Sequence, residues 1–293
     1  MKWAMAAIAA RALTACMAMT AASAAESAAP LTVGALCLRQ PKQDLVQFSG
    51  ALVYGVTGGG PAPMLYAGGP IGLIAGVITQ GAIESHKQSK EKQIWRESAD
   101  RVLEPYRPVL EDFTNAELMR QALESLATDG SKTLLKFTDP AGPGLQIESV
   151  PIFYMTHDAR SIVLENALLI RSAGANPKVA PLFKSVVKIV AAPRARVLPG
   201  EQDSWISNQG EELRALAIEE LRDSLRLALA EIARGNDAVP REFRNVHYFE
   251  SDVPKMEHAQ VLADLPDHLV LKTLRGWIMW VPVTDAIHAM RSE

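Results

Sequence analysis

Cysteine is nearly absent from this chain. The 293 residues contain only two cysteines, Cys16 and Cys37. Cys16 lies within the first 25 residues, which have the composition of a leader, so a chain that loses them keeps Cys37 alone. A single cysteine excludes an intrachain disulfide framework, and stability must therefore come from a packed core. The chain is long enough to bury one large core or two smaller ones.

The sequence also lacks a block of basic residues. Lys and Arg number 30 against 33 Asp and Glu, which gives a formal net charge of −3. Removal of Lys2 and Arg11 with the leader takes this charge from −3 to −5. Nucleic-acid binding needs clustered Lys and Arg, so we expect no nucleic-acid partner.

Catalytic and cofactor motifs are missing as well. The sequence has no HExxH, GxSxG, P-loop or dinucleotide fingerprint, and the spacing of its six histidines fits no zinc motif. We therefore predict no catalytic residue, no metal ligand and no cofactor. If a metal or acid–base site is formed, His247, Glu257 and His258 are the first candidates. Cys37 lies in a strand-like run without a motif around it, and we interpret it as a small core residue.

The N-terminus has the build of an export signal. Lys2 and Arg11 are the only charges before Glu26, and the rest of the leader is mostly Ala, Met, Leu and Ile. A small-residue cleavage site precedes Glu26, which predicts release into the periplasm. The alternative is acylation of Cys16, because Leu13-Thr14-Ala15-Cys16 resembles a lipobox, although Arg11 interrupts its apolar run. An uncleaved anchor is disfavoured because the apolar stretch is short.

A long uncharged stretch follows two strand-like runs. No charged residue occurs from Leu45 to Ile83. Within it Gly68, Gly72 and Gly76 fall four apart and Gly81 follows, which predicts a helix with glycines stacked on one face. Such a helix can insert partly into a membrane or pack against a second copy of itself. The alternatives are a helix in the protein's own core and a transmembrane span over residues 62–83.

Two kinds of helix are predicted after this stretch. Residues 85–113 are charged with a helical period, and Pro105 and Pro108 end or kink that helix. Thr114 and Glu117 have the spacing of a capping box, which predicts a further helix that stops at Gly130.

The second half of the chain is typical of an antiparallel sheet with one long helix. The runs TLLKFTD, LQIESVPIFYM, SIVLENALLIRS, LFKSVVKIVAA, FRNVHYFE and HLVLKTLRGWIMWVPV read as strands. His157 and Asp158 fall between two of them, and we interpret this pair as turn residues rather than an acid–base pair. Residues 210–234 form an amphipathic helix that should pack on the sheet. Trp277 and Trp280 are predicted to pack in the core, with an exposed membrane or partner patch as the alternative.

The layout resembles a group of uncharacterised exported proteins of proteobacteria. It consists of the leader, the glycine-rich apolar helix, the charged helix and a β-rich half that begins near PIFYMTHDARSIVLENALLI. Many proteins of that group look like lipoproteins with a glycine-zipper segment. The likeness covers the layout rather than a strict motif, and the interrupted lipobox departs from it. The resemblance implies a location in the cell envelope and no particular activity.

These observations together predict an α+β protein in three parts. Residues 1–25 are the signal peptide, and residues 26–130 hold a strand pair, the glycine-zipper helix and the charged helices. Residues 131–293 hold an antiparallel sheet covered by the long amphipathic helix. We expect an envelope structural or interaction protein that self-associates or binds an envelope partner, with membrane contact through Gly68–Gly81. The alternatives are an accessory binding subunit of an envelope transport or assembly system and an enzyme of unknown class.

Overall fold

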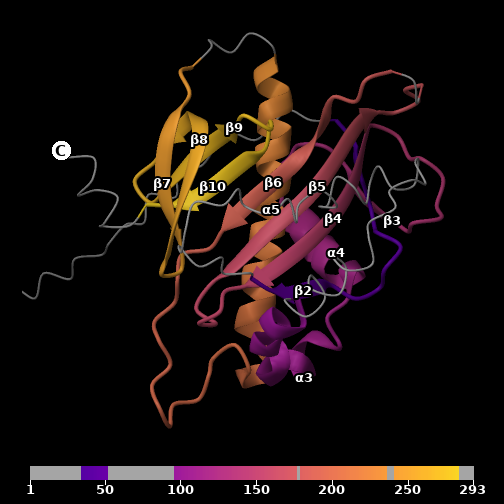
Figure 1. The fold of residues 1–293 in the computed structure, drawn as a ribbon. Coiled ribbons are helices and arrows are strands. Elements are labelled where there is room, and N and C mark those ends of the chain that lie inside the picture. Colours follow the sequence, from indigo (N-terminus) through magenta and orange to yellow (C-terminus); the bar gives the residue numbers. More distant parts are fainter. Residues whose placement is uncertain (1–33, 52–95, 177–178, 236–240, 284–293) are drawn as a thin grey trace, which may run out of the picture.

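The computed structural model describes residues 34–51, 96–176, 179–235 and 241–283 (Figure 1). The leader with Cys16, the glycine stretch with Gly68, Gly72, Gly76 and Gly81, and the first part of the charged helix lie outside the described residues. The predictions made for them stay predictions.

One mixed sheet of ten strands forms the centre of the described part of the chain. The strand order is β3-β1-β4-β5-β6-β10-β9-β8-β7, and β2 also pairs with β4. The strands are β1 (Leu36–Arg39), β2 (Gln47–Gly50), β3 (Lys132–Leu135), β4 (Leu145–Met155), β5 (Ile162–Ser172), β6 (Phe183–Val190), β7 (Arg244–Glu250), β8 (Val253–Asp264), β9 (His268–Thr273) and β10 (Ile278–Pro282). The long strand pairs β4–β5, β5–β6, β7–β8 and β8–β9 are antiparallel. Helices combined with a large, mostly antiparallel sheet agree with the predicted fold class.

The predicted pairing of the two N-terminal strands with each other is wrong. β1 lies parallel to β4 along Leu145–Glu148, and β2 lies parallel to β4 along Ile152–Met155. β1 also pairs in parallel with β3, and β10 in parallel with β6. β4 is 11 residues long, whereas β1 and β2 have 4 residues each. One edge of β4 therefore offers enough backbone groups for both short strands in succession.

Two of the predicted helices are present. α4 (Asn115–Ser125) begins as expected, because the Thr114 hydroxyl accepts a hydrogen bond of 3.2 Å from the Glu117 amide. It ends earlier than the predicted stop at Gly130, since Leu126 already has an extended backbone. α5 (Glu211–Arg234) has the predicted bounds. It runs along one face of β5 and β6 with α4 beside it (Figure 1).

The charged segment breaks into short helices near its two prolines. The part of this segment that the structure describes begins with a helical stretch at residues 96–100. A 3-10 helix, η2 (Arg101–Tyr106), contains Pro105, and α3 (Arg107–Leu110) has Pro108 in its first turn. Proline has no backbone N–H group. A continuous α-helix through this segment would need a backbone hydrogen bond from both proline positions, which explains the change of helix type.

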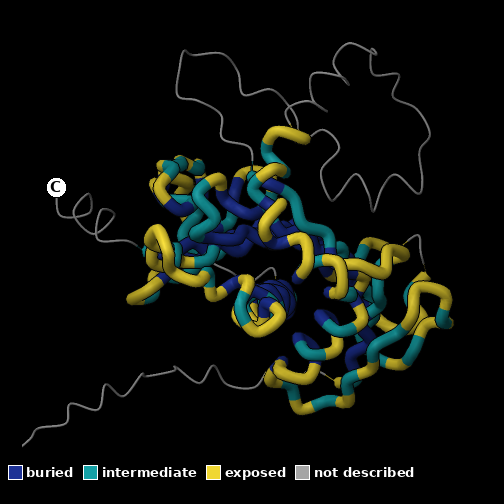
Figure 2. Tube along the Cα trace, turned by 90° about the horizontal axis from the view of Figure 1, so that it is seen from below, coloured by how far each residue is buried: buried dark blue, intermediate teal, exposed yellow. Residues whose placement is uncertain are grey.

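The central strand β5 is buried on both faces. Its even-numbered residues, such as Leu164 and Leu168, belong to the large core cluster that α5 covers. On the opposite face Val163 packs with Val246 and Tyr248 of β7. β7 therefore lies against the face of β5 and β6 that α5 does not cover. Figure 2 shows the buried residues gathered at the centre of the described chain, with exposed residues around them.

Residues from both sides of position 130 share the main core. Leu36 and Phe113 lie in one hydrophobic cluster with Leu164 and Leu221, and all four side chains are fully buried. The predicted division of the chain at residue 130 stays a prediction, and the described residues on its two sides pack together.

Candidate functional site

A cluster of charged side chains is buried between β7 and the central strands. Glu165 of β5 lies directly opposite Lys188 of β6 in the strand register, on the face away from α5. The Lys188 Nζ is 2.6 Å from Oε1 of Glu250 in β7 and 3.9 Å from Oε1 of Glu165. Tyr248 donates a hydrogen bond of 3.3 Å to the same Glu250 oxygen. Lysine and two carboxylates thus meet where apolar side chains surround them.

The two carboxylates of this cluster differ in their electrostatics. Burial raises the pKa of Glu165, and the opposite charge of Lys188 only partly offsets that effect. Its Oε2 has no hydrogen-bond partner among the described residues. Burial also opposes ionisation of Glu250, but Lys188 and Lys255 hold the pKa of that carboxyl below its usual value. Burial raises the pKa of Tyr248. The cluster therefore combines a charged carboxylate with one that retains its proton more readily.

A second polar cluster fixes the long loop at residues 191–206. The Arg194 guanidinium binds both carboxylate oxygens of Asp203, and it lies over the Trp205 ring at 3.9 Å from the ring centroid. Tyr106 donates a hydrogen bond of 2.7 Å to Asp203. Burial opposes the charge on Asp203, but the bonds from Arg194 and Tyr106 lower its pKa to about 2. This cluster joins the loop to η2.

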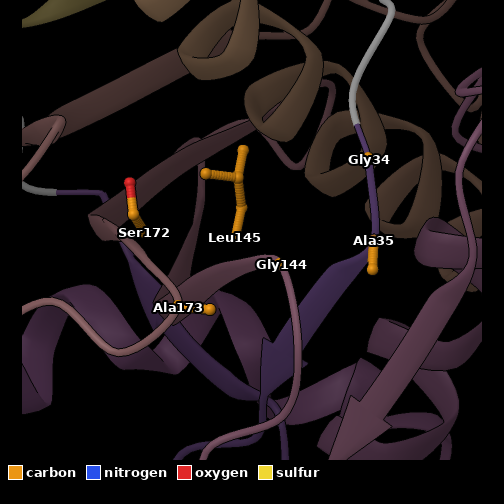
Figure 3. Close-up of a pocket in the computed structure, with 6 residues that line it drawn as sticks. All are labelled: Gly34, Ala35, Gly144, Leu145, Ser172 and Ala173. Carbon is orange, nitrogen blue, oxygen red and sulfur yellow. The ribbon is translucent and has the colours of Figure 1, made fainter.

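Two open hollows occur on the surface of the described chain. The hollow in Figure 3, about 280 Å³ in volume, lies where β1 and β4 begin and β5 ends. Its lining residues are Gly34, Ala35, Gly144, Leu145, Ser172 and Ala173. The second, about 390 Å³, lies beside the first turn of α5 and is lined by polar residues that include Ser204, Asn208 and Glu212. The buried charge cluster borders neither hollow, so these openings give a substrate no path to its carboxylates.

The three residues singled out from the sequence do not converge. Glu257 is on the inner face of β8, with its carboxylate 3.5 Å from Arg275. His247 and His258 are exposed on the outer face of the β7–β8 hairpin. An acid–base site built from this carboxylate and the two histidines is therefore not formed.

The other sequence interpretations agree with the structure. His157 and Asp158 lie in the turn between β4 and β5, where Asp158 accepts hydrogen bonds from Thr156 and Ser251. Cys37 is buried in β1, and its thiol donates to the Pro143 carbonyl at 3.1 Å.

The C-terminal tryptophans pack as the core interpretation predicts. Trp277 is 9% exposed and joins a small cluster with Val186. Trp280 is half-buried and stacks on His268 with 3.6 Å between ring centroids.

The structure brings together the two ends of the stretch that it does not describe between β2 and η2. The Gly50 amide donates a hydrogen bond of 2.7 Å to the Asp100 carboxylate. The backbones are so close that a Cβ at position 50 would lie 1.9 Å from the Ala99 carbonyl oxygen. The described residues on the two sides of residues 52–95 are therefore in direct contact at Gly50 and Ala99.

Neither the described residues nor similarity to known proteins assigns a metal site, a membrane span or a family. Among the described residues, no group of three His, Cys, Asp or Glu side chains is arranged to hold a metal ion. No helix in the described part of the chain is long and apolar enough to cross a membrane. Comparison of the chain with protein-family models, curated proteins and solved structures gives no match.

Proposed function

We propose that the protein is an exported structural or interaction protein of the bacterial cell envelope, held at a membrane through residues Gly68–Gly81. The observation that supports this proposal best is the junction between Gly50 and Asp100. Their 2.7 Å hydrogen bond joins the described residues on either side of residues 52–95, which contain the glycine-rich segment.

The junction favours one mode of membrane contact over another. A single crossing would place the two ends of the stretch on opposite sides of a hydrocarbon layer about 30 Å thick. Contact between Gly50 and Ala99 argues against such a separation. A glycine-rich segment that enters and leaves from one side can insert shallowly or pack against a second copy, as stripes of small residues do.

The leader supplies the second part of the proposal. Export follows from the charge pattern of residues 1–25, either with cleavage before Glu26 or with acylation of Cys16. β1 begins opposite Leu145, whereas β2 ends opposite Met155 at the far end of β4. At about 3.3 Å per residue these two points are roughly 33 Å apart. A lipid at Cys16 and the glycine stretch would therefore hold the folded body at two separate places.

Membrane fractionation tests this proposal. The full chain is produced with Cys16→Ser, so that no lipid holds it, and membranes are washed with salt and then carbonate. We expect the chain to stay with the membranes. A further change of Gly72 and Gly76 to Lys should release it, because lysine is costly in hydrocarbon, by up to about 2.5–3.5 kcal/mol at the bilayer centre, and because its bulk prevents close packing of a second helix. The matched control, Ser89→Lys, adds charge outside the uncharged stretch and should leave the chain bound.

The outcome that contradicts the proposal is equally direct. Complete release of the Cys16→Ser chain by salt and carbonate, as a monomer, would show that the glycine stretch neither holds a membrane nor joins copies. The intact mass and N-terminal sequence of the exported chain separate cleavage before Glu26 from acylation at Cys16.

An accessory binding subunit is the second candidate, and the loop at residues 191–206 favours it. The loop extends away from the sheet below η2 and α5 (Figure 1). Leu198 near its tip is 56% exposed, while Arg194 and Asp203 hold its base. A preorganised loop with an exposed apolar side chain suits a protein partner, because little entropy is lost on binding. This candidate predicts a partner that co-purifies with the chain and is lost on Leu198→Asp.

A further inference from the structure

The β7–β8 hairpin carries two histidines and a methionine on one surface. In its antiparallel register His247 is directly opposite Met256, and Asn245 is directly opposite His258. Side chains two residues apart on a strand point to the same face. His247 therefore shares a face with Asn245, and Met256 shares that face with His258.

The burial pattern shows that this face is the outer one. Val246 and Tyr248 of β7 are buried against the central strands. His247, which lies between these two residues in β7, points the other way and is exposed. Met256 of β8 is 58% exposed. His258 is exposed as well. The two imidazoles and the thioether are thus accessible to a ligand from solvent.

One of the histidines has the second hydrogen bond that metal-bound histidines usually have. The Nδ1 of His258 is 2.8 Å from the Asn245 side-chain oxygen. An amide oxygen only accepts hydrogen bonds, so Nδ1 carries the proton and Nε2 keeps a free lone pair. The ring also stacks on Phe243, with 5.9 Å between centroids and 20° between planes. A hydrogen bond from the second ring nitrogen is the usual support of a metal-bound histidine, because it fixes the tautomer and the ring direction.

The strand register places the three side chains close enough for one ion to bind all of them once the His258 ring turns from Phe243 toward His247. Directly opposite residues such as His247 and Met256 have Cβ atoms about 4.5–5.5 Å apart, and diagonal neighbours such as His247 and His258 are about 7–8 Å apart. Metal–nitrogen and metal–sulfur bonds of about 2.0–2.3 Å allow long side chains at such spacings to converge.

We propose that His247, Met256 and His258 form a binding site for Cu(I). The thioether decides the metal, because soft sulfur ligands select Cu(I), whereas carboxylates and carbonyls suit Mg²⁺, Ca²⁺ and Mn²⁺. The nearest carboxylate in sequence, Glu257, points to the opposite face and pairs with Arg275. The sequence suggested the Glu257 carboxylate as the third ligand beside the two histidines. In the structure the Met256 sulfur takes that place.

Competition for Cu(I) with a chromophoric chelator tests the site on the full chain under reducing conditions. Cys16 and Cys37 are present in every variant, so differences between variants report on the hairpin alone. We expect His258→Gln to weaken Cu(I) binding at this site at least 100-fold, and Met256→Leu, which removes only the sulfur, at least 10-fold. Asn245→Ala should weaken it about 10-fold through loss of the support for His258. Zn(II) binding should be insensitive to Met256→Leu.

A matched control and the fold of each variant complete the experiment. His157→Gln removes an exposed histidine elsewhere and should leave Cu(I) affinity unchanged. All substituted side chains are exposed, so thermal unfolding without metal should be the same for each variant within about 2 °C. Equal Cu(I) affinity of the unaltered chain and the His258→Gln variant overturns the proposal. Unchanged Cu(I) affinity in Met256→Leu overturns the assignment of the metal to a thioether site.

Discussion

The buried carboxyl group of Glu220 in α5 should make the free energy of unfolding depend on pH. The side chain is fully buried in the helix that covers β5 and β6, and neither carboxylate oxygen has a hydrogen-bond partner among the described residues. Burial raises its pKa well above the usual 4.5, and the nearby charges of Asp223 and Glu219 add to that effect. In the unfolded chain the same carboxyl ionises near pH 4.5.

The sign of the pH effect follows from this difference. Between pH 4.5 and the pKa in the folded state, the unfolded chain releases the Glu220 proton and the folded chain keeps it. The contribution of Glu220 to stability is therefore full below pH 4.5 and is lost as the pH rises toward the folded pKa. The loss is about 1.4 kcal/mol per pH unit, so between pH 4.5 and 7 it reaches at most about 3.4 kcal/mol.

Glu220→Gln removes the ionisable group and nearly keeps its shape. We expect the variant to resemble the unaltered chain below pH 4.5 and to exceed it at pH 7 by up to about 3 kcal/mol, or about 6–12 °C in Tm. Urea unfolding at a series of pH values measures the difference. The control Glu219→Gln, whose carboxylate is 58% exposed and pairs with Arg222, should change stability by less than about 1 kcal/mol at every pH. If the free energies of unfolding of Glu220→Gln and of the unaltered chain differ by the same amount at every pH from 4.5 to 8, the reasoning is refuted.

Three further predictions concern other buried contacts. Lys188→Met removes the cation that lies between Glu165 and Glu250 and leaves only Lys255 beside Glu250, so it should cost about 3–5 kcal/mol in urea unfolding. Asp203→Asn should cost about 2 kcal/mol at pH 7 and speed trypsin cleavage after the exposed Arg196. The unaltered chain should lose the same amount as the pH falls from about 4 to about 2, because the Asp203 pKa of about 2 is depressed in the fold. Gly210→Ala should cost at least about 2 kcal/mol, because the backbone φ is +75° and the new Cβ would lie 1.9 Å from a valine methyl carbon. Gly200→Ala has a comparable positive φ and open space around it, so its smaller loss in thermal unfolding isolates the backbone strain.

Regular local patterns were readable from the sequence. The apolar stripe of α5 and the capping residue Thr114 of α4 depend on residues a few positions apart, and both helices begin as predicted. The neighbourhood of His247, Glu257 and His258 was expected to be sheet, but the bounds of β8 were not readable, because Lys255 and Glu257 on its inner face make the run look polar. Their charges are paired with Glu250 of β7 and with Arg275 in the turn between β9 and β10.

Long-range pairing was not readable. Nothing near Leu36 or Gly50 in the sequence indicates that both strands lie along β4, more than a hundred residues later. The burial of Lys188 depends on Glu250 from β7 in the same way. The candidate metal site combines both kinds of information: the two histidines were noticed in the sequence, and the strand register replaced Glu257 with Met256 as their neighbour.

The placement of β1 and β2 along β4 has a consequence for how the chain reaches its fold. The first strands to be synthesised have their hydrogen-bonding partners at Leu145–Glu148 and Ile152–Met155, so they cannot be completed until the middle of the chain is available. Contacts so distant in sequence form slowly, because a long loop must close before any pairing energy is gained. β1 and β2 thus stay without their β4 partner while synthesis continues, which is compatible with the export that we propose. In this protein the strands that leave the ribosome first are among the last to find their place.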